Sequence, residues 1–313
     1  MAYSPLTSSS SSFSTRLENI PTLGMGVSTE YGALAARGSL DVKRLLRESP
    51  EYAQVLELGI ELAKGLDEES LAWVDAGRPT TYHFLDINLD DPRDFDRSWL
   101  DGVRSIINRI QPVWLCGDAG LWHHGPRAQE HMILLPPILE RDSAFALADG
   151  IIRLREETGL EVFPENPPGH VFVGPLHLLD FFAIVLDRAD TGMLLDAAHL
   201  TIYQDSMDLP VTTGLDGFPL DRVIELHMAG GAEKSAQGLK YIADDHSPTI
   251  LPGTWKIFDT IASSLTELRA AIFECERNRY EDCIAPMKNL RSRLDQHLPK
   301  HSSWFNRSSY ERF

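Results

Sequence analysis

The chain has 313 residues, 43% of them hydrophobic, which is enough to bury a large core in one big domain or two smaller ones. Its formal net charge of -17 predicts a surface that repels phosphate backbones and anionic membranes, so nucleic acid and membrane are excluded as expected partners. The three cysteines, Cys116, Cys275 and Cys283, form no CxxC pair. They indicate neither a disulfide framework nor a thiolate zinc site, and they fit a reducing cytoplasm.

The N-terminal segment is rich in serine and lacks the basic and apolar regions of a secretory signal. No apolar run reaches the roughly 20 residues that a membrane-spanning helix needs. We expect residues 1–20 to form a flexible tail, residues 21–297 to form a single catalytic domain, and residues 298–313 to form a basic and aromatic C-terminal tail. That last segment could contact a partner, but packing over the domain or partial disorder is the simpler expectation.

Eight short runs of strand-forming residues follow one another along the chain, separated by longer segments of helical period. Residues 94–111, for example, place Leu100, Val103 and Ile107 on one helical face. Segments 204–219 and 227–238 look like long loops. Eight strands alternating with helices predict an α/β fold, a TIM-type (β/α)8 barrel. The expected strands are residues 23–27, 54–58, 81–87, 113–118, 161–166, 192–198, 223–230 and 270–276.

Polar side chains fall at or near the ends of these strands. In a TIM barrel the C-terminal ends of the strands form the mouth that holds the active site, whereas the strand middles pack the core. The sequence therefore predicts a ring of carboxylates and imidazoles around one mouth. Its members are Glu57, His83, Asp118, Glu165, Asn166, Asp196, His199, His227 and Glu274, together with Asp244, Asp245 and His246 after the seventh strand.

Each of these residues has a structural interpretation as well, because a single His or Asp near a strand end more often caps or hydrogen-bonds than binds a ligand. For Glu57 alone the structural interpretation comes first, and His123 and His124 fit a solvated loop at least as well as a ligand pair. Charges gathered at one buried mouth, however, would repel one another without a compensating cation. The group as a whole therefore predicts a metal site.

The kind of ligand limits the choice of metal. Carboxylates and imidazoles without thiolates suit iron, manganese or zinc, and two histidines with one carboxylate around open positions is the arrangement of non-haem iron oxygenases. The candidate ligands exceed what one ion can use. We expect two or more metals that share a bridging carboxylate such as Asp196 or Glu165.

Several short motifs, in a consistent order, resemble one known family. They are "PEN" (164–166), "LLDAAHL" (194–200), "ELHMAGG" (225–231), "DDHS" (244–247) and "IFE" (272–274). Together they are similar to the multinuclear non-haem iron-dependent oxidative enzymes, which include the methanobactin-biosynthesis oxidase and the 3-thiaglutamate-pathway enzyme. The resemblance spans most of the chain and implies a xylose-isomerase-like barrel.

The resemblance implies specific roles for residues at the mouth. Asp245 is a weaker candidate, because the family spaces its Asp and His two residues apart. Many members also have Ser-Asp-His-Leu after the fourth strand, where this chain reads "CGDAGLWHHGP". Asp118 keeps a carboxylate there but the adjacent imidazole is missing, which leaves a third metal dependent on His123 or His124. The implied metal ligands are Asn166, Asp196, His199, His227, Asp244, His246 and Glu274, with Glu57 beside them, and His83, Asp118 and Glu165 are the candidate catalytic residues.

The resemblance also implies a function: two or three irons in mixed Fe(II)/Fe(III) states, with O2 as co-substrate, would modify a residue, often cysteine, of a ribosomally made precursor peptide. A separate protein would recognise the leader of that peptide. Two other functions remain open on the sequence alone. One is a divalent-metal sugar isomerase or epimerase on a xylose-isomerase-like barrel, and the other is a non-catalytic peptide-binding barrel that keeps metal for structure.

Overall fold

The computed structural model describes residues 12–29, 40–127, 133–300 and 304. Eight parallel strands form a closed barrel, in which the sheet order runs β6-β5-β4-β3-β2-β1-β9-β7 and β7 pairs back with β6. All eight lie where the sequence predicted strands, so the predicted (β/α)8 barrel is confirmed. They are β1 (Gly24–Thr29), β2 (Val55–Ile60), β3 (Thr80–Phe84), β4 (Leu115–Asp118), β5 (Val162–Glu165), β6 (Met193–Asp196), β7 (Val223–Ala236) and β9 (Ala270–Glu274).

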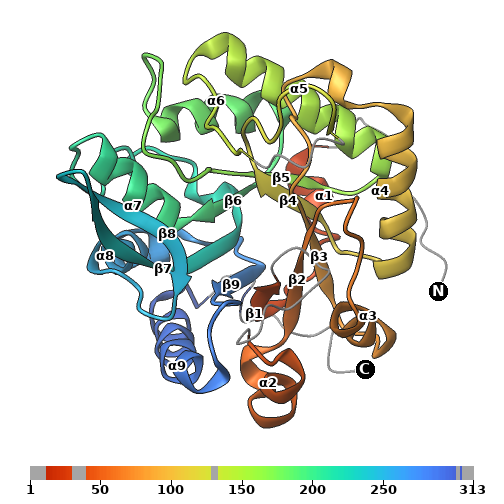
Figure 1. The fold of residues 1–313 in the computed structure, drawn as a ribbon, viewed down its shortest axis with the longest axis vertical. Helices are drawn as coiled ribbons and strands as arrows, with labels where there is room; N and C mark the ends of the chain where they lie inside the picture. The colour runs from red at the N-terminus through yellow and green to blue at the C-terminus, as the bar shows by residue number, and fades with distance from the viewer. Residues whose placement is uncertain (1–11, 30–39, 128–132, 301–303, 305–313) are drawn as a thin grey trace.

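Helices surround this barrel, as Figure 1 shows. The helix α4 illustrates their construction: Asp96 caps its start by accepting from the Trp99 amide at 2.9 Å, and Leu100, Val103 and Ile107 are buried. Short 3-10 turns lie at 50–52, 92–94, 220–222 and 262–264. The helices of the outer layer are α2 (Val42–Glu48), α3 (Glu68–Asp75), α4 (Arg97–Ile110), α5 (Arg141–Thr158), α6 (Leu178–Ala189), α7 (Ala197–Ser206), α8 (Pro252–Ile261) and α9 (Tyr280–His297).

The N-terminal end of the barrel is closed by a short helix, α1 (Phe13–Leu17). Phe13 and Leu17 are buried together with the barrel residues Val55 and Trp114. This differs from the flexible tail expected for residues 1–20. Two apolar side chains within the serine-rich stretch find a hydrophobic surface at the base of the barrel, and residues 1–11 lie outside the described residues.

The segment 227–238, expected to be a long loop, is mostly strand, and that expectation was wrong. The strand β7 continues to Ala236. After a short turn, β8 (Leu239–Ser247) runs back antiparallel to it. Most of the hairpin lies away from the core, so both of its faces can carry glycines and polar residues. Such a composition resembles that of a loop.

The C-terminal segment expected to be a tail is described only to residue 300 and at Trp304. Trp304 is fully buried, and its indole Nε1 donates to Asp295 Oδ1 at 3.3 Å. This part of the segment therefore packs against α9. In the described residues, no helix is both long and apolar enough to cross a membrane.

Candidate metal centre

The barrel strands place their polar residues in one layer by simple alternation. Successive side chains of a strand point to opposite faces, so residues two apart share a face. Cys116, Phe163, Leu194 and Ile272 pack in the apolar base of the barrel. Two residues later on the same strands come Asp118, Glu165, Asp196 and Glu274, all buried. The same spacing relates Val55 to Glu57 on β2, so the sequence alternation builds an ionisable layer above an apolar one.

The hairpin of β7 and β8 adds two more side chains to this layer from above. Asp244 and His246 lie on one face of β8, whereas Asp245 points away and its Oδ2 lies 3.8 Å from Lys234 Nζ. The close approach of β8 requires glycine at position 230, because a Cβ there would lie 2.0 Å from the Ser247 carbonyl oxygen. The expected preference for Asp244 over Asp245 agrees with this geometry.

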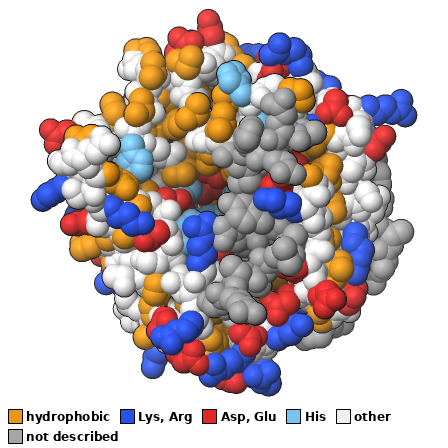
Figure 2. Space-filling view, in the orientation of Figure 1, with side chains coloured by type: hydrophobic (Ala, Val, Ile, Leu, Met, Phe, Trp, Pro, Cys, Tyr) orange, Lys and Arg blue, Asp and Glu red, His pale blue; other side chains and the backbone are white. Residues whose placement is uncertain are grey.

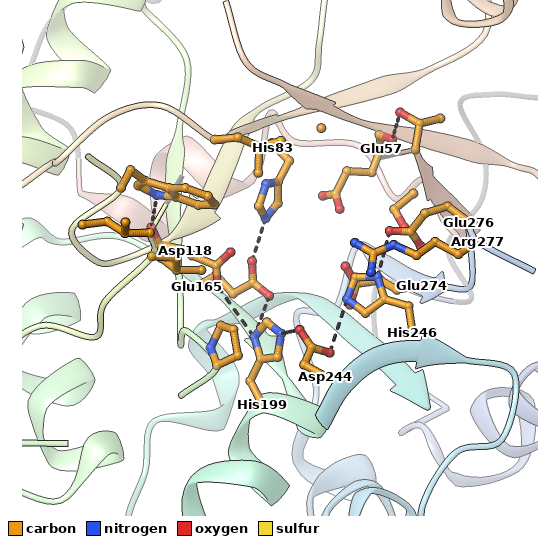
Figure 3. A pocket seen from close by; sticks show the side chains of 18 residues that line it. Glu57, His83, Asp118, Glu165, His199, Asp244, His246, Glu274, Glu276 and Arg277 are labelled. Carbon is orange, nitrogen blue, oxygen red and sulfur yellow. Dashed lines mark hydrogen bonds and ion pairs between the residues drawn. The ribbon is translucent and has the colours of Figure 1, made fainter. Parts of the chain in front are cut away.

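The described residues contain five groups of His, Cys, Asp or Glu whose ligand atoms lie within 4.8 Å of one another. Glu165 and His199 each belong to two of the groups, which joins three of them into one cluster at the mouth. Figure 3 shows how most of these side chains face a common space. The groups are His199, Asp244 and His246; Glu57, His227 and Glu274; His83, Asp118 and Glu165; Glu165, Asp196 and His199; and, in the layer below, Glu57, Cys116 and Glu225.

Two histidines are oriented so that Nε2 faces the cluster. His199 Nδ1 lies 2.9 Å from the backbone oxygen of Asn166, which can only accept, so Nδ1 carries the proton. Its Nε2 lies 3.3 Å from Asp244 Oδ2 and is the nitrogen that would bind a metal after losing its proton. His246 repeats the pattern: Nδ1 lies 2.8 Å from Glu276 Oε1, and Nε2 lies 3.4 Å from Asp244 Oδ1. A partner on Nδ1 that leaves Nε2 open is the usual arrangement of a metal-binding imidazole.

Unsatisfied polar atoms test whether a cation fits here. Thirteen buried side-chain nitrogen and oxygen atoms among the described residues lack a hydrogen-bond partner, and eight of them belong to the four ligand groups at the mouth. Buried polar atoms are rarely left unpaired, and carboxylate oxygens cannot donate to one another. Bound cations would satisfy these atoms and offset the negative charge, so the residues fit a metal centre. The eight atoms are Asp118 Oδ1, Glu165 Oε1, Asp196 Oδ2, His199 Nε2, His227 Nδ1 and Nε2, Asp244 Oδ1 and Glu274 Oε2.

The pKa values follow from burial and from these crowded charges. Burial opposes protonation of His83, but its hydrogen bond with Glu165 and the charge of Glu57 raise its pKa to about 9. Burial and the charge of Glu165 raise the pKa of Asp118 to about 8. Burial, together with the charges of Glu274 and Glu165, raises the pKa of Asp196 well above its usual range, against the lowering effect of His199. Without metal, protons therefore compensate part of the charge that cations would otherwise offset.

The side chain of Asn166 is hydrogen-bonded to the backbone of Asp196 through both of its polar atoms. Its Nδ2 donates to the Asp196 carbonyl and its Oδ1 accepts from the Asp196 amide, both at 2.9 Å. These bonds tie the end of β5 to the end of β6 and hold Asp196 toward the cluster. Its assignment as a metal ligand stays a prediction.

His123 and His124 do not replace the missing imidazole after β4. His123 is bound on both nitrogens, with Nε2 at 3.0 Å from Asp94 Oδ2 and Nδ1 at 2.8 Å from the Gly125 oxygen. His124 is exposed on the loop. His123 instead anchors this loop to Asp94, and the fourth strand contributes Asp118 to the centre.

Sequence reasoning missed two residues that border the centre, Ser28 and Glu276. Ser28 Oγ donates to Glu276 Oε2 at 3.2 Å, and the other oxygen of Glu276 accepts from His246. The signal was present, because Glu276 lies two residues after Glu274 and thus on the same side of the extended chain. Ser28 likewise lies two residues after Gly26 on β1, so the two residues share one face of the strand.

A third missed residue, Glu225, lies in the layer below, two residues before His227. Its Oε2 accepts from Trp114 Nε1 at 2.7 Å, and burial raises its pKa to about 8. Cys116 nearby places Sγ 3.1 Å from Glu57 Oε2, and burial raises the pKa of this thiol well above its usual range. The thiol therefore stays protonated and donates to Glu57, which leaves carboxylates and imidazoles as the ligand set.

The centre opens into a cavity of about 240 Å³. Glu57, His83, Asp118, Glu165, His199, Asp244, His246 and Glu274 line it from the barrel side, with Glu276 and Arg277 beside them. Trp122, Ile133, Leu134 and Pro168 form an apolar wall. A closed (β/α)8 barrel with a cavity over a cluster of potential metal ligands defines the class: a TIM-barrel protein with a candidate metal centre at its mouth.

Comparison with known proteins places the chain in a particular family. Residues 42–293 match the family of "RiPP precursor modification enzyme MbnB/TglH/ChrH", and the chain belongs to this family. A UPF0276 protein of Rhizorhabdus wittichii is 22% identical over 77% of this chain and 82% of its own length. A UPF0276 protein of Acaryochloris marina is 23% identical over 77% of this chain and 86% of its own. The family resemblance inferred from the motifs is confirmed.

Solved structures confirm the fold. A xylose isomerase-like TIM barrel protein from Mycobacterium smegmatis, in complex with magnesium, aligns with a TM-score of 0.56 over 90% of this chain and 99% of its own, at 9% identity. The IOLI protein with a zinc atom aligns with a TM-score of 0.52 over 88% of this chain and 99% of its own, at 11% identity. At such identities the likeness concerns the barrel alone.

Proposed function

We propose that this protein is an iron-dependent, O2-using oxidative enzyme that modifies a residue, in many cases cysteine, of a ribosomally made precursor peptide. One observation carries the proposal: the family's precursor-modifying class coincides in this chain with adjoining His and carboxylate groups that face a cavity. Carboxylate and imidazole ligands without a thiolate suit iron. A divalent-metal sugar isomerase would also use carboxylate and imidazole ligands on such a barrel, but the family match does not favour it.

The ligand groups support two or three ions. In this proposal His199, Asp244 and His246 would hold one ion, and Glu57, His227 and Glu274 would hold another. Asp196 and Glu165 lie between them: both share a ligand group with His199, and Glu165 Oε1 is 3.4 Å from His227 Nδ1. Glu165 belongs to two ligand groups and would therefore offer its carboxylate to more than one ion. The group of His83, Asp118 and Glu165 could hold a third.

The protein's own residues would supply position, shielding and proton transfer. Bound iron would provide the one-electron chemistry and the activation of O2. The apolar wall around Trp122 limits the access of water to the substrate. His83, with Nε2 2.7 Å from Glu165 Oε2 and its ring bordering the cavity, can release or accept a proton next to bound substrate.

A test of this function starts from the genes beside this one, among which we expect one that encodes a short precursor peptide. The chain would be produced together with that peptide and with any small neighbouring protein, which we propose as the reader of the leader. We expect a change in the peptide's mass, measured by mass spectrometry, that requires both iron and O2. A peptide that stays unmodified in the presence of iron, O2 and the neighbouring protein would contradict the proposal.

A further inference from the structure

Exposed hydrophobic side chains are concentrated beside the cavity. Seven large hydrophobic side chains are exposed among the described residues, and five of them lie in the two loops that follow β4 and β5. We call these five residues the apolar rim: Ile133, Leu135, Ile138, Val171 and Val173. Val171 is 75% exposed and Val173 is 61% exposed. Such clustering marks a binding surface more often than scattered exposed residues do.

The two loops lie side by side and are held together by their backbones. The Leu139 amide donates to the Val173 oxygen at 2.7 Å, and the Leu176 amide donates to the Leu139 oxygen at 3.0 Å. Leu135 pairs with Leu121 in a short antiparallel bridge. These bonds show that the apolar rim is a built surface of defined shape.

The apolar rim continues into the cavity. Ile133 belongs to both, and Leu134 and Pro168, from the same two loops, line the cavity wall. In Figure 2, hydrophobic side chains gather next to the hollow in which acidic and histidine side chains are visible. A molecule that reaches the metal centre can therefore rest its neighbouring parts on the rim.

The size of the cavity indicates what rests there. Its volume of about 240 Å³ lies below the roughly 300–1,000 Å³ of pockets that enclose drug-sized ligands. One side chain of a peptide would fit inside, and the residues next to it must lie outside. The rim itself is too small for a stable protein interface, which takes about 20–30 residues on each side.

We propose that the apolar rim binds hydrophobic side chains of the precursor peptide that flank the reacting residue, and so selects peptides with an apolar segment at that place. This inference rests on the proposed function for its peptide substrate. The hydrophobic effect supplies the affinity, and the loops after β4 and β5 direct the bound chain toward the centre.

Peptide binding tests the rim directly. The probes are two short fluorescein-labelled peptides with alanine at the centre, one flanked by leucine and valine and the other by serine and threonine. Fluorescence anisotropy would measure their binding to the full-length, metal-loaded chain, and the central alanine excludes thiol ligation. The rim variant is Val171→Ser with Val173→Ser. The matched control is Met207→Ser with Leu239→Ser, which removes the two large hydrophobic side chains that the described part of the chain exposes outside the rim.

We expect the apolar probe to bind the wild type and the control variant equally, and to bind the rim variant about tenfold more weakly. The polar probe should bind all three proteins weakly. Equal binding of both probes, or unchanged binding by the rim variant, would overturn the proposal. Loss of self-association by the rim variant, without peptide binding, would overturn it in favour of contact with a second copy of the chain.

A separate measurement distinguishes failure of this inference from failure of the proposed function. Iron-dependent O2 uptake is recorded with cysteine-containing versions of the two probes. Uptake with both versions alike would overturn the selective rim and leave the oxidative function standing. Selective binding of the apolar probe without O2 uptake would support the rim and contradict the oxidative function.

Discussion

Glu276 Oε1 and His246 Nδ1 lie 2.8 Å apart, so a carboxylate that follows β9 orients an imidazole at the end of β8. His246 has a left-handed backbone with φ of 48°, which few non-glycine residues adopt. Its carbonyl accepts from Asn278 Nδ2 at 2.6 Å. The segment after β9 therefore holds both the backbone and the ring of His246 in place, with Nε2 turned toward Asp244.

Removal of this carboxylate should weaken metal binding without unfolding the barrel. We expect Glu276→Ala to lower the affinity for Co²⁺ by about 10- to 100-fold, the usual effect of losing a residue that orients a ligand. Titration followed by the visible spectrum of bound Co²⁺ measures both affinity and coordination. The control is Glu281→Gln, at an exposed glutamate of α9 that pairs with Arg44. An unchanged affinity and spectrum in Glu276→Ala would show that His246 needs no such support.

Asp196 has two tasks that two substitutions can separate. Its Oδ1 caps α7 by accepting from the His199 amide at 2.6 Å, and its Oδ2 is one of the unsatisfied atoms. Asp196→Asn keeps a capping oxygen, so we expect loss of metal with little change in melting temperature. Asp196→Ala should lose metal and also about 1 kcal/mol of stability. Metal analysis and thermal unfolding check both variants, and full metal occupancy in either would contradict the assigned site.

Metal binding should release protons and depend on pH. In the metal-free protein the pKa of His83 is about 9 and that of Asp118 about 8, so both hold a proton at pH 7. A folded-state pKa above the unfolded value gives stability that is lost as the pH rises through the folded pKa. For His83 this stability is complete below its ordinary value of 6.5, and for Asp118 below 3.8.

The metal-free protein should therefore lose thermal stability between pH 7 and 9, by a few degrees. The metal-loaded protein should not, and its metal affinity should rise over the same range. Thermal unfolding of both forms and proton release in a dye-buffered solution measure these effects. Parallel curves for the two forms, with no proton released, would refute the prediction.

The position of β8 against β7 should change when Gly230 is substituted. The substitution Gly230→Ala places a Cβ 2.0 Å from the Ser247 oxygen and must displace β8, which carries Asp244 and His246. We expect it to reduce the bound metal by about one ion per chain. The neighbouring Gly231→Ala is the control, because its nearest atom lies at 3.1 Å and can give way. Equal metal content in the two variants would show that the hairpin does not set the site.

The barrel could be predicted because strand and helix periods are local signals, and each strand end is marked by a polar residue such as Asp118 or Glu274. The hairpin could not, since its pairing joins Gly231 to Asp244 across a turn whose polar residues also suit a loop. Glu276 was missed although it ends the predicted strand 270–276, because the motif that marks this strand end stops at Glu274. The sequence could not decide between a structural and a metal-binding role for His123, because its hydrogen-bond partner Asp94 lies 29 residues earlier in the chain.

The central claim is a multinuclear iron centre, and Mössbauer spectroscopy combined with metal analysis tests it most directly. The protein would be purified anaerobically after growth with iron, measured, and then exposed to O2. We predict two or more protein-bound irons per chain, with coupled Fe(II) and Fe(III) signals that change on exposure to O2. One tightly bound zinc or manganese ion, with no oxygen-sensitive iron, would contradict the account and favour an isomerase.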